Sequence, residues 1–138
     1  MRVEDDGWCF ACGEHNPIGL RLEFQFRGDD YVARFRVQPE HAGYAGILHG
    51  GIMATLLDES MSRLLWVQGY RVLTGRLTVQ YRTPVPIGSE IEVRGRIESV
   101  RRAGGIVQTS ASATVGEQVV AEATALSAPP AEAVDDSE

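Results

Sequence analysis

A pair of glycines and an acid at helical spacing are the residues of this sequence best placed to do chemistry. Gly50 and Gly51 precede an apolar segment, residues 52–66, whose large side chains recur as in an α-helix. Backbone N–H groups at a helix start lack partners within the helix and lie at the positive end of its dipole. They could therefore stabilise a carbonyl oxygen as it becomes an oxyanion. Asp58 lies two turns further on, where its carboxylate could act as base or nucleophile.

The same residues have plainer explanations, which the sequence leaves open. Gly50-Gly51 could be a simple turn from loop into helix, and Asp58 could be a solvated or ion-paired surface acid. Asp58 shares its side of the helix with small, uncharged residues, which argues against a solvated carboxylate. These are Gly51, Ala54, Thr55 and Ser62. Because small residues permit close approach of another backbone or a ligand, we predict a helix that is covered on both sides.

Cys9 and Cys12 form a second candidate group, a CxxC pair. Such a pair is half of a zinc site or a redox pair. His15 could supply a third ligand, and a site within one chain would have to recruit His41 or His49. The acidic first residues do not form a secretory signal, so a structural disulfide is not expected. We favour two reduced thiols in an N-terminal lead-in, and we expect no metal and no other cofactor.

Composition narrows the class of protein. A chain of 138 residues with 43% hydrophobic residues fits one folded domain. Its net charge of −6 is concentrated in four acids after residue 130, and the remaining 15 acids and 13 bases nearly balance. There is no basic face for nucleic acid and no apolar run that could span a membrane, so a cytoplasmic location is expected. Motifs of serine hydrolases, P-loop proteins, zinc proteases and dinucleotide-binding folds are absent.

The predicted elements are two strands, one long helix and four more strands. Period-two alternation predicts a hairpin from residues 20–27 and 31–37. After the helix, strands are predicted at 72–82, 90–100, 106–115 and 118–127, with antiparallel neighbours because the turns are short. The alternation in the first of these puts Leu73 and Leu77 on one face and Thr74 on the other. A curved sheet wrapped around one helix, with a partner subunit over the open side, satisfies this order.

Part of the sequence resembles the hotdog-fold acyl-CoA thioesterases of the PaaI type. Residues 46–59 read Gly-Ile-Leu-His-Gly-Gly-Ile-Met-Ala-Thr-Leu-Leu-Asp-Glu, which is similar to the family's HGG-to-acid motif. The resemblance continues through residues 78–84 and 86–88 and covers about residues 20–128. The opening Cys-Phe-x-Cys-Gly and Asn-Pro-x-Gly-Leu motifs look like a subgroup with this lead-in. The resemblance implies an α+β hotdog fold with about six strands.

The resemblance also implies roles for four residues near the helix. Asp58 matches the acid that serves as general base or nucleophile on the thioester. Gly51 matches the glycine whose N–H polarises the thioester carbonyl, and His49 matches a histidine that mainly shapes the helix start. Thr74 matches a strand hydroxyl that helps to place the attacking water, although it could equally be a plain strand residue. Glu59 is interpreted as a surface or subunit-interface acid.

CoA contacts are implied for Gly50 and for two further segments. One segment comprises Tyr81, Arg82, Thr83 and Pro84, and the other comprises Arg101, Arg102 and Gly104. The second segment has a plainer alternative, a solvated hairpin turn. The sequence departs from the family at Gly43, where some relatives carry an asparagine near the thioester.

These expectations combine into one hypothesis. Residues 1–19 form the lead-in, 20–128 the hotdog domain and 129–138 a disordered acidic tail. The chain is expected to hydrolyse an acyl-CoA thioester to a free acid and CoA, as a homodimer or a dimer of dimers. The alternatives are a non-catalytic acyl-CoA-binding module, another hotdog activity such as a dehydratase, and a metal- or redox-sensing role for the cysteines.

Overall fold

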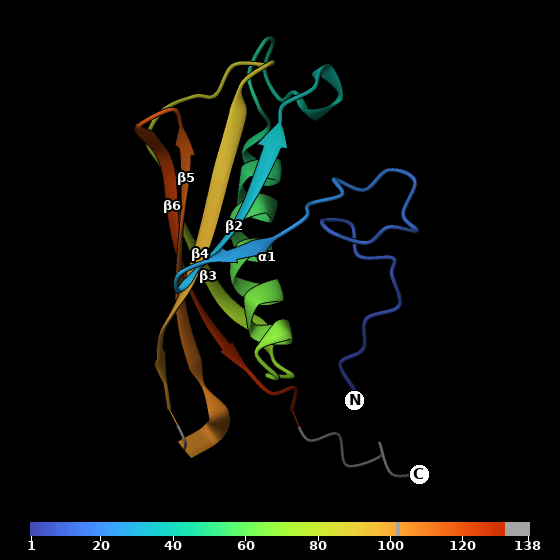
Figure 1. Cartoon of the computed structure of the whole chain (residues 1–138), viewed down its shortest axis with the longest axis vertical. Helices are drawn as coiled ribbons and strands as arrows, with labels where there is room; N and C mark the ends of the chain where they lie inside the picture. The colour runs from blue at the N-terminus through green and yellow to red at the C-terminus, as the bar shows by residue number, and fades with distance from the viewer. Residues whose placement is uncertain (102, 132–138) are drawn as a thin grey trace.

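The computed structural model describes residues 1–101 and 103–131, and it shows one long helix against a six-stranded antiparallel sheet (Figure 1). The sheet order is β1-β2-β4-β5-β6-β3. The strands are β1 (Gln25–Arg27), β2 (Asp30–Arg36), β3 (Leu73–Tyr81), β4 (Glu90–Val100), β5 (Val107–Val115) and β6 (Gln118–Ala128). The helix α1 spans Gly50–Val67, and two short 3-10 turns, η1 and η2, span Pro39–His41 and Ala103–Gly105. This is the predicted hotdog arrangement.

The large side chains of α1 form the centre of the core. Leu56, Leu57, Met61 and Leu65 are at most 1% exposed, and α1 contacts every strand from β2 to β6. The closest approach is to β4, where a Cβ at Gly95 would clash with the main-chain oxygen of Ser60. A glycine on the strand and a small residue on the helix therefore let the two backbones touch.

The first predicted strand is much shorter than expected. Only Gln25–Arg27 pairs with β2, whereas residues 20–24 turn back along the lead-in. The amides of Leu20 and Leu22 donate to the carbonyls of Phe10 and Ala11, at 2.8 and 2.9 Å. Between them Arg21 has a positive φ of 57°, which interrupts an extended strand. The alternation in this segment reflects burial of side chains beneath the lead-in.

The strand after the helix differs from its predicted alternation. Register between β3 and β6 shifts between Thr74 and Arg76, so Gly75 is the extra residue of a β-bulge. The bulge places Thr74 on the same face as Leu77 and Val79, towards α1, and leaves Leu73 exposed. The predicted grouping of Leu73 with Leu77 is therefore wrong, and Thr74 is turned towards the helix.

The lead-in and β3 lie on different sides of α1. The N-terminal segment passes over the side of the helix away from the sheet (Figure 1), where Ala11 is 4% exposed. β3 pairs with β6 and is one edge of the sheet. Most of the predicted acidic tail, residues 132–138, lies outside the described residues.

Candidate active site

The start of α1 is capped by its own histidine. His49 is the N-cap residue, and its Nδ1 accepts the N–H of Gly51 at 2.8 Å. The Gly50 amide donates no hydrogen bond within the described part of the chain, and its carbonyl accepts the Tyr81 hydroxyl at 2.7 Å. The Gly51 amide predicted to bind a carbonyl oxygen thus has an acceptor already, and a substrate oxygen would replace the imidazole nitrogen there.

Gly43 occupies the position at which some relatives of the resembled family carry an asparagine. Its amide donates to the carbonyl of Ile47 at 2.9 Å, and a Cβ at this position would lie 3.0 Å from the Cα of His49. The loop therefore packs directly on the capping histidine, and a larger side chain at residue 43 would displace it.

Asp58 lies in a cluster of hydroxyl groups between α1 and β3. Its Oδ1 accepts the Thr74 hydroxyl at 2.9 Å and the Ser62 hydroxyl at 3.4 Å, and the two hydroxyls are 3.2 Å apart. Its Oδ2 has no hydrogen-bond partner among the described residues. The carboxylate is half-buried and oriented, with one oxygen available. Ser62 was not predicted as a site residue, although its position one turn after Asp58 is a signal for this contact.

Asp58 and the helix start are well separated within one chain. Seven residues of α-helix rise by about 10.5 Å, so the Gly51 amide and the Asp58 backbone are two turns apart. The groups that act on one carbonyl, a donor and an attacking atom, lie within roughly 6–7 Å of each other. The structure therefore brings Asp58 and Thr74 together, but it does not bring them to Gly51.

The first predicted CoA segment lines a cleft beside the helix start. Gly50 and all four residues of the segment, Tyr81 to Pro84, face this cleft. Its other walls are apolar, from Ile47, Leu48, Met53, Val85 and Val120. Arg82 is also held on the surface, where its Nε donates to Glu122 at 2.6 Å.

The second predicted CoA segment lies elsewhere. Arg101 and Gly104 belong to the hairpin between β4 and β5, at the end of the molecule opposite the start of α1 (Figure 1). Arg101 is exposed and Gly104 has a positive φ of 79° in the turn. Arg102 lies outside the described residues. Within one copy the two segments do not form one site.

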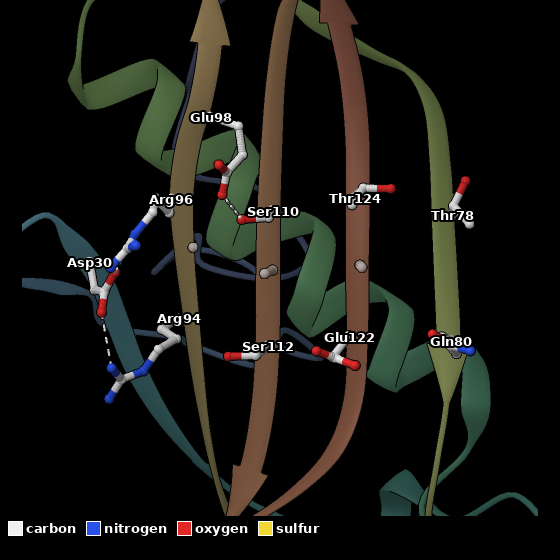
Figure 2. Close-up of a pocket in the computed structure, with 13 residues that line it drawn as sticks. Asp30, Thr78, Gln80, Arg94, Arg96, Glu98, Ser110, Ser112, Glu122 and Thr124 are labelled. Atoms are coloured by element: carbon white, nitrogen blue, oxygen red, sulfur yellow. Dashed lines mark hydrogen bonds and ion pairs between the residues drawn. The ribbon is translucent and has the colours of Figure 1, made fainter.

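A shallow polar groove covers the sheet face opposite α1. Figure 2 shows Thr78, Ser110, Ser112 and Thr124 projecting from neighbouring strands, with the helix behind the sheet. At its edge Asp30 accepts from Arg94 and Arg96 at 2.9 and 2.7 Å. None of the predicted catalytic residues lines this groove.

Glu59 is not a solvent-exposed surface acid, the first of the two alternatives expected for it. It is half-buried beneath the lead-in, and Cys9 Sγ lies 3.7 Å from its Oε2. Burial raises the pKa of the Glu59 carboxyl and of the Cys12 thiol. His15, which the sequence offered as a possible third ligand if a metal were bound, lies beside Gly7 and Trp8.

The part of the chain that matches a known protein family contains α1 and the strands that follow it, as far as the start of β5. Residues 45–109 match the family model described as the thioesterase superfamily. The predicted resemblance to thioesterases is confirmed. Among curated relatives, acyl-coenzyme A thioesterase THEM4 of Bos taurus is 30% identical over 86 residues, which are 59% of this chain and 35% of that protein. The chain spans about a third of the length of the first curated relatives it matches.

Solved structures show the same fold. A thioesterase superfamily protein, RHA08564, superposes with a TM-score of 0.81 over 88% of this chain and 60% of its own, at 21% identity. The protein smu.793 of Streptococcus mutans, whose structure holds acetyl CoA, has a TM-score of 0.70 at 23% identity, over 78% of this chain and 86% of its own. None of the helices within residues 1–101 and 103–131 has the length and hydropathy needed to span a membrane.

Proposed function

We propose that this chain hydrolyses an acyl-CoA thioester to a free carboxylic acid and CoA. The observation that carries the proposal is the Asp58 carboxylate, which is half-buried, oriented by Thr74 at 2.9 Å and left with one oxygen unpartnered among the described residues. A carboxylate held in this way is suited to accept a proton from water or to attack directly. The relatives named acyl-coenzyme A thioesterases and the neighbour that holds acetyl CoA support the substrate class.

The carbonyl oxygen of the thioester would bind at the Gly51 amide. The oxygen replaces His49 Nδ1 as acceptor, and the helix dipole favours the negative charge that develops on it. An aligned donor of this kind contributes about 10²–10³ in rate, and a positioned base about 10²–10⁴. Both effects act on the transition state, so both would appear in kcat.

The site would contain Gly51 of one copy and Asp58 of a second copy. The separation of about two helical turns in one chain supports this division. β3 is an edge strand of nine residues, and such an edge presents unpaired backbone groups to another chain. An antiparallel contact between two β3 edges would place opposite ends of the two copies together. It would also bring the hairpin with Arg101 and Gly104 towards the cleft at Tyr81, where both could contact CoA. We expect a homodimer, which could pair into a tetramer.

The test combines a substrate panel with mixed variants. Thiol release is measured on short, long and aromatic acyl-CoAs for wild type, Asp58→Asn and Gly51→Pro, which removes the amide hydrogen at a position in the first helical turn where proline is tolerated. Gly51→Ala, which keeps the amide, is the matched control. Each inactive variant alone should show little turnover.

Mixing the two inactive variants then tests the shared site. When they are unfolded and refolded together in equal amounts, half the dimers are mixed and each mixed dimer has one intact site, so about a quarter of the wild-type activity should return. No recovery would place both groups in one chain. Acyl-CoA binding without turnover by wild type would favour the binding module instead.

A further inference from the structure

Two cysteines and a glutamate come together where the lead-in crosses α1. The sulfur atoms of Cys9 and Cys12 and a carboxylate oxygen of Glu59 all lie within 4.8 Å of one another. The cysteines come from the start of the chain and the glutamate from the middle of the helix, 50 residues beyond Cys9. Thiolate and carboxylate are ligand types of zinc, and this group plays no part in the proposed hydrolysis.

The turn around the cysteines has a defined backbone structure. The Cys12 amide donates to Cys9 Sγ at 3.4 Å, and the Gly13 amide donates to the Cys9 carbonyl at 2.8 Å. A Cβ at Gly13 would clash with the backbone of Cys9 and Gly7, so the turn requires glycine after the second cysteine. Backbone contacts of the turn therefore hold the two cysteines in a defined arrangement.

One ligand separation already matches that of a tetrahedral zinc site, and none exceeds it by more than about 1 Å. Zinc–sulfur and zinc–oxygen bonds of about 2.3 and 2.1 Å at tetrahedral angles put neighbouring ligand atoms about 3.6–3.8 Å apart. The Cys9 Sγ to Glu59 Oε2 distance is 3.7 Å. A closure of about 1 Å brings the widest pair, at most 4.8 Å apart, to the same value. Three protein ligands leave a fourth position for water.

We propose that Cys9, Cys12 and Glu59 bind one zinc ion, which fastens the N-terminal lead-in to α1. Two thiolates, a carboxylate and Zn²⁺ sum to a charge of −1. Arg63, one helical turn after Glu59, lies on the same side of the helix and is paired with Asp5 of the lead-in at 2.7 Å. The lead-in is thus attached to α1 at two adjacent points, one a metal site and one an ion pair.

The first experiment measures metal content. The full chain is produced without an affinity tag that binds metal, reduced, supplied with zinc, passed through a desalting column and analysed by mass spectrometry. About one zinc per chain is expected for wild type and less than a tenth for Cys9→Ser and Cys12→Ser. His15→Ala, which changes a neighbouring potential ligand outside the group, should keep its zinc. Glu59→Gln should weaken binding by at least tenfold.

A second measurement does not depend on the variants folding. Cobalt replaces zinc in wild type, and its visible and near-ultraviolet spectrum reports tetrahedral geometry and thiolate ligation. Chelation should also increase amide hydrogen exchange in residues 9–13 and at Glu59 together. A wild-type protein that stays metal-free with excess zinc, or zinc that remains in both cysteine variants, would overturn the proposal. Loss of zinc in His15→Ala would overturn this ligand set. Because the readouts are metal content, spectrum and exchange, they are independent of acyl-CoA turnover.

Discussion

Asp58 and Glu59 are consecutive acids on one helix, yet they meet different parts of the molecule. Asp58 faces the hydroxyls of Thr74 and Ser62 beside the edge strand β3. Glu59, rotated by about 100°, faces the cysteines of the lead-in. Burial raises the pKa of the Glu59 carboxyl, and its hydrogen bonds with the Cys12 and Cys9 thiols lower that pKa by less. One step along a helix therefore separates an oriented catalytic candidate from a candidate metal ligand.

Among the variants that test the difference between the two acids, Asp58→Asn should have the largest effect. This change keeps the size of the side chain but removes its ability to take a proton or attack, so kcat for acyl-CoA should fall by about 100-fold or more. Steady-state thiol release measures the loss, and urea unfolding should show little change. Glu117→Gln, in the exposed β5–β6 turn, is the matched control and should retain full turnover. Unchanged turnover in Asp58→Asn would remove it from the chemistry.

Thr74→Val sharpens the Asp58 side of the comparison. Valine has nearly the same shape as threonine but cannot donate to Asp58 Oδ1, and a hydrogen bond to a charged group contributes about 1.5 kcal/mol, or about tenfold in rate. The loss should appear in kcat rather than KM. Thr78→Val, on the other face of β3 (Figure 2), should have no effect on kcat. Equal losses in both variants would mean that strand stability, and not the hydroxyl, is being measured.

The attachment of the lead-in to α1, beneath which Glu59 lies, is tested through the ion pair between Asp5 and Arg63. The Gly7 amide and the Arg63 guanidinium lower the pKa of the Asp5 carboxyl, so folding favours its charged form. This stabilisation is present above about pH 4 and is lost as pH falls through the lowered folded-state value. Asp5→Asn should lower the free energy of unfolding by about 0.2–1 kcal/mol at pH 7 and by much less near pH 2.

Asp6→Asn is the matched control for this ion pair. Asp6 makes a similar bond to the amide of Trp8, at 3.0 Å. Urea unfolding of both variants at the two pH values measures the difference. A loss in Asp5→Asn that is independent of pH would contradict the electrostatic explanation.

Ser62→Ala should have the smallest effect. The Ser62 hydroxyl lies 3.4 Å from Asp58 Oδ1, a long contact compared with the 2.9 Å of Thr74. We expect kcat to fall by less than about threefold. If the loss instead equals that of Thr74→Val, the two hydroxyls act as one unit, and the double variant would then lose no more than either single variant.

The sequence predicted what depends on local periodicity. The helix, the β5–β6 hairpin and the six-stranded wrap follow from the spacing of apolar residues, and these were found as expected. The bulge at Gly75 was missed because the residue types continue to alternate through it, so the pattern does not mark the extra residue. The short β1 was missed because Leu22 alternates with polar neighbours although its burial is due to the lead-in.

For the site, the sequence identified the residue types but not their partners. The contact of Glu59 with Cys9 joins segments 50 residues apart, and no periodicity encodes it. The bond from the Gly51 amide to His49 is local, but it depends on a side-chain rotamer. The separation of Gly51 from Asp58 does follow from helix geometry alone, and it carries the expectation of a second subunit.

The contact between Gly95 and Ser60 limits how the molecule can move. Side chains can change rotamer when a ligand binds, but two backbones in direct contact cannot slide or roll past each other without separating. Ser60 directly follows Asp58 and Glu59, so this contact fixes the position of both acids relative to the sheet. We therefore expect conformational changes on binding of substrate or metal to occur in the His49 ring and the lead-in, while α1 keeps its position on the sheet.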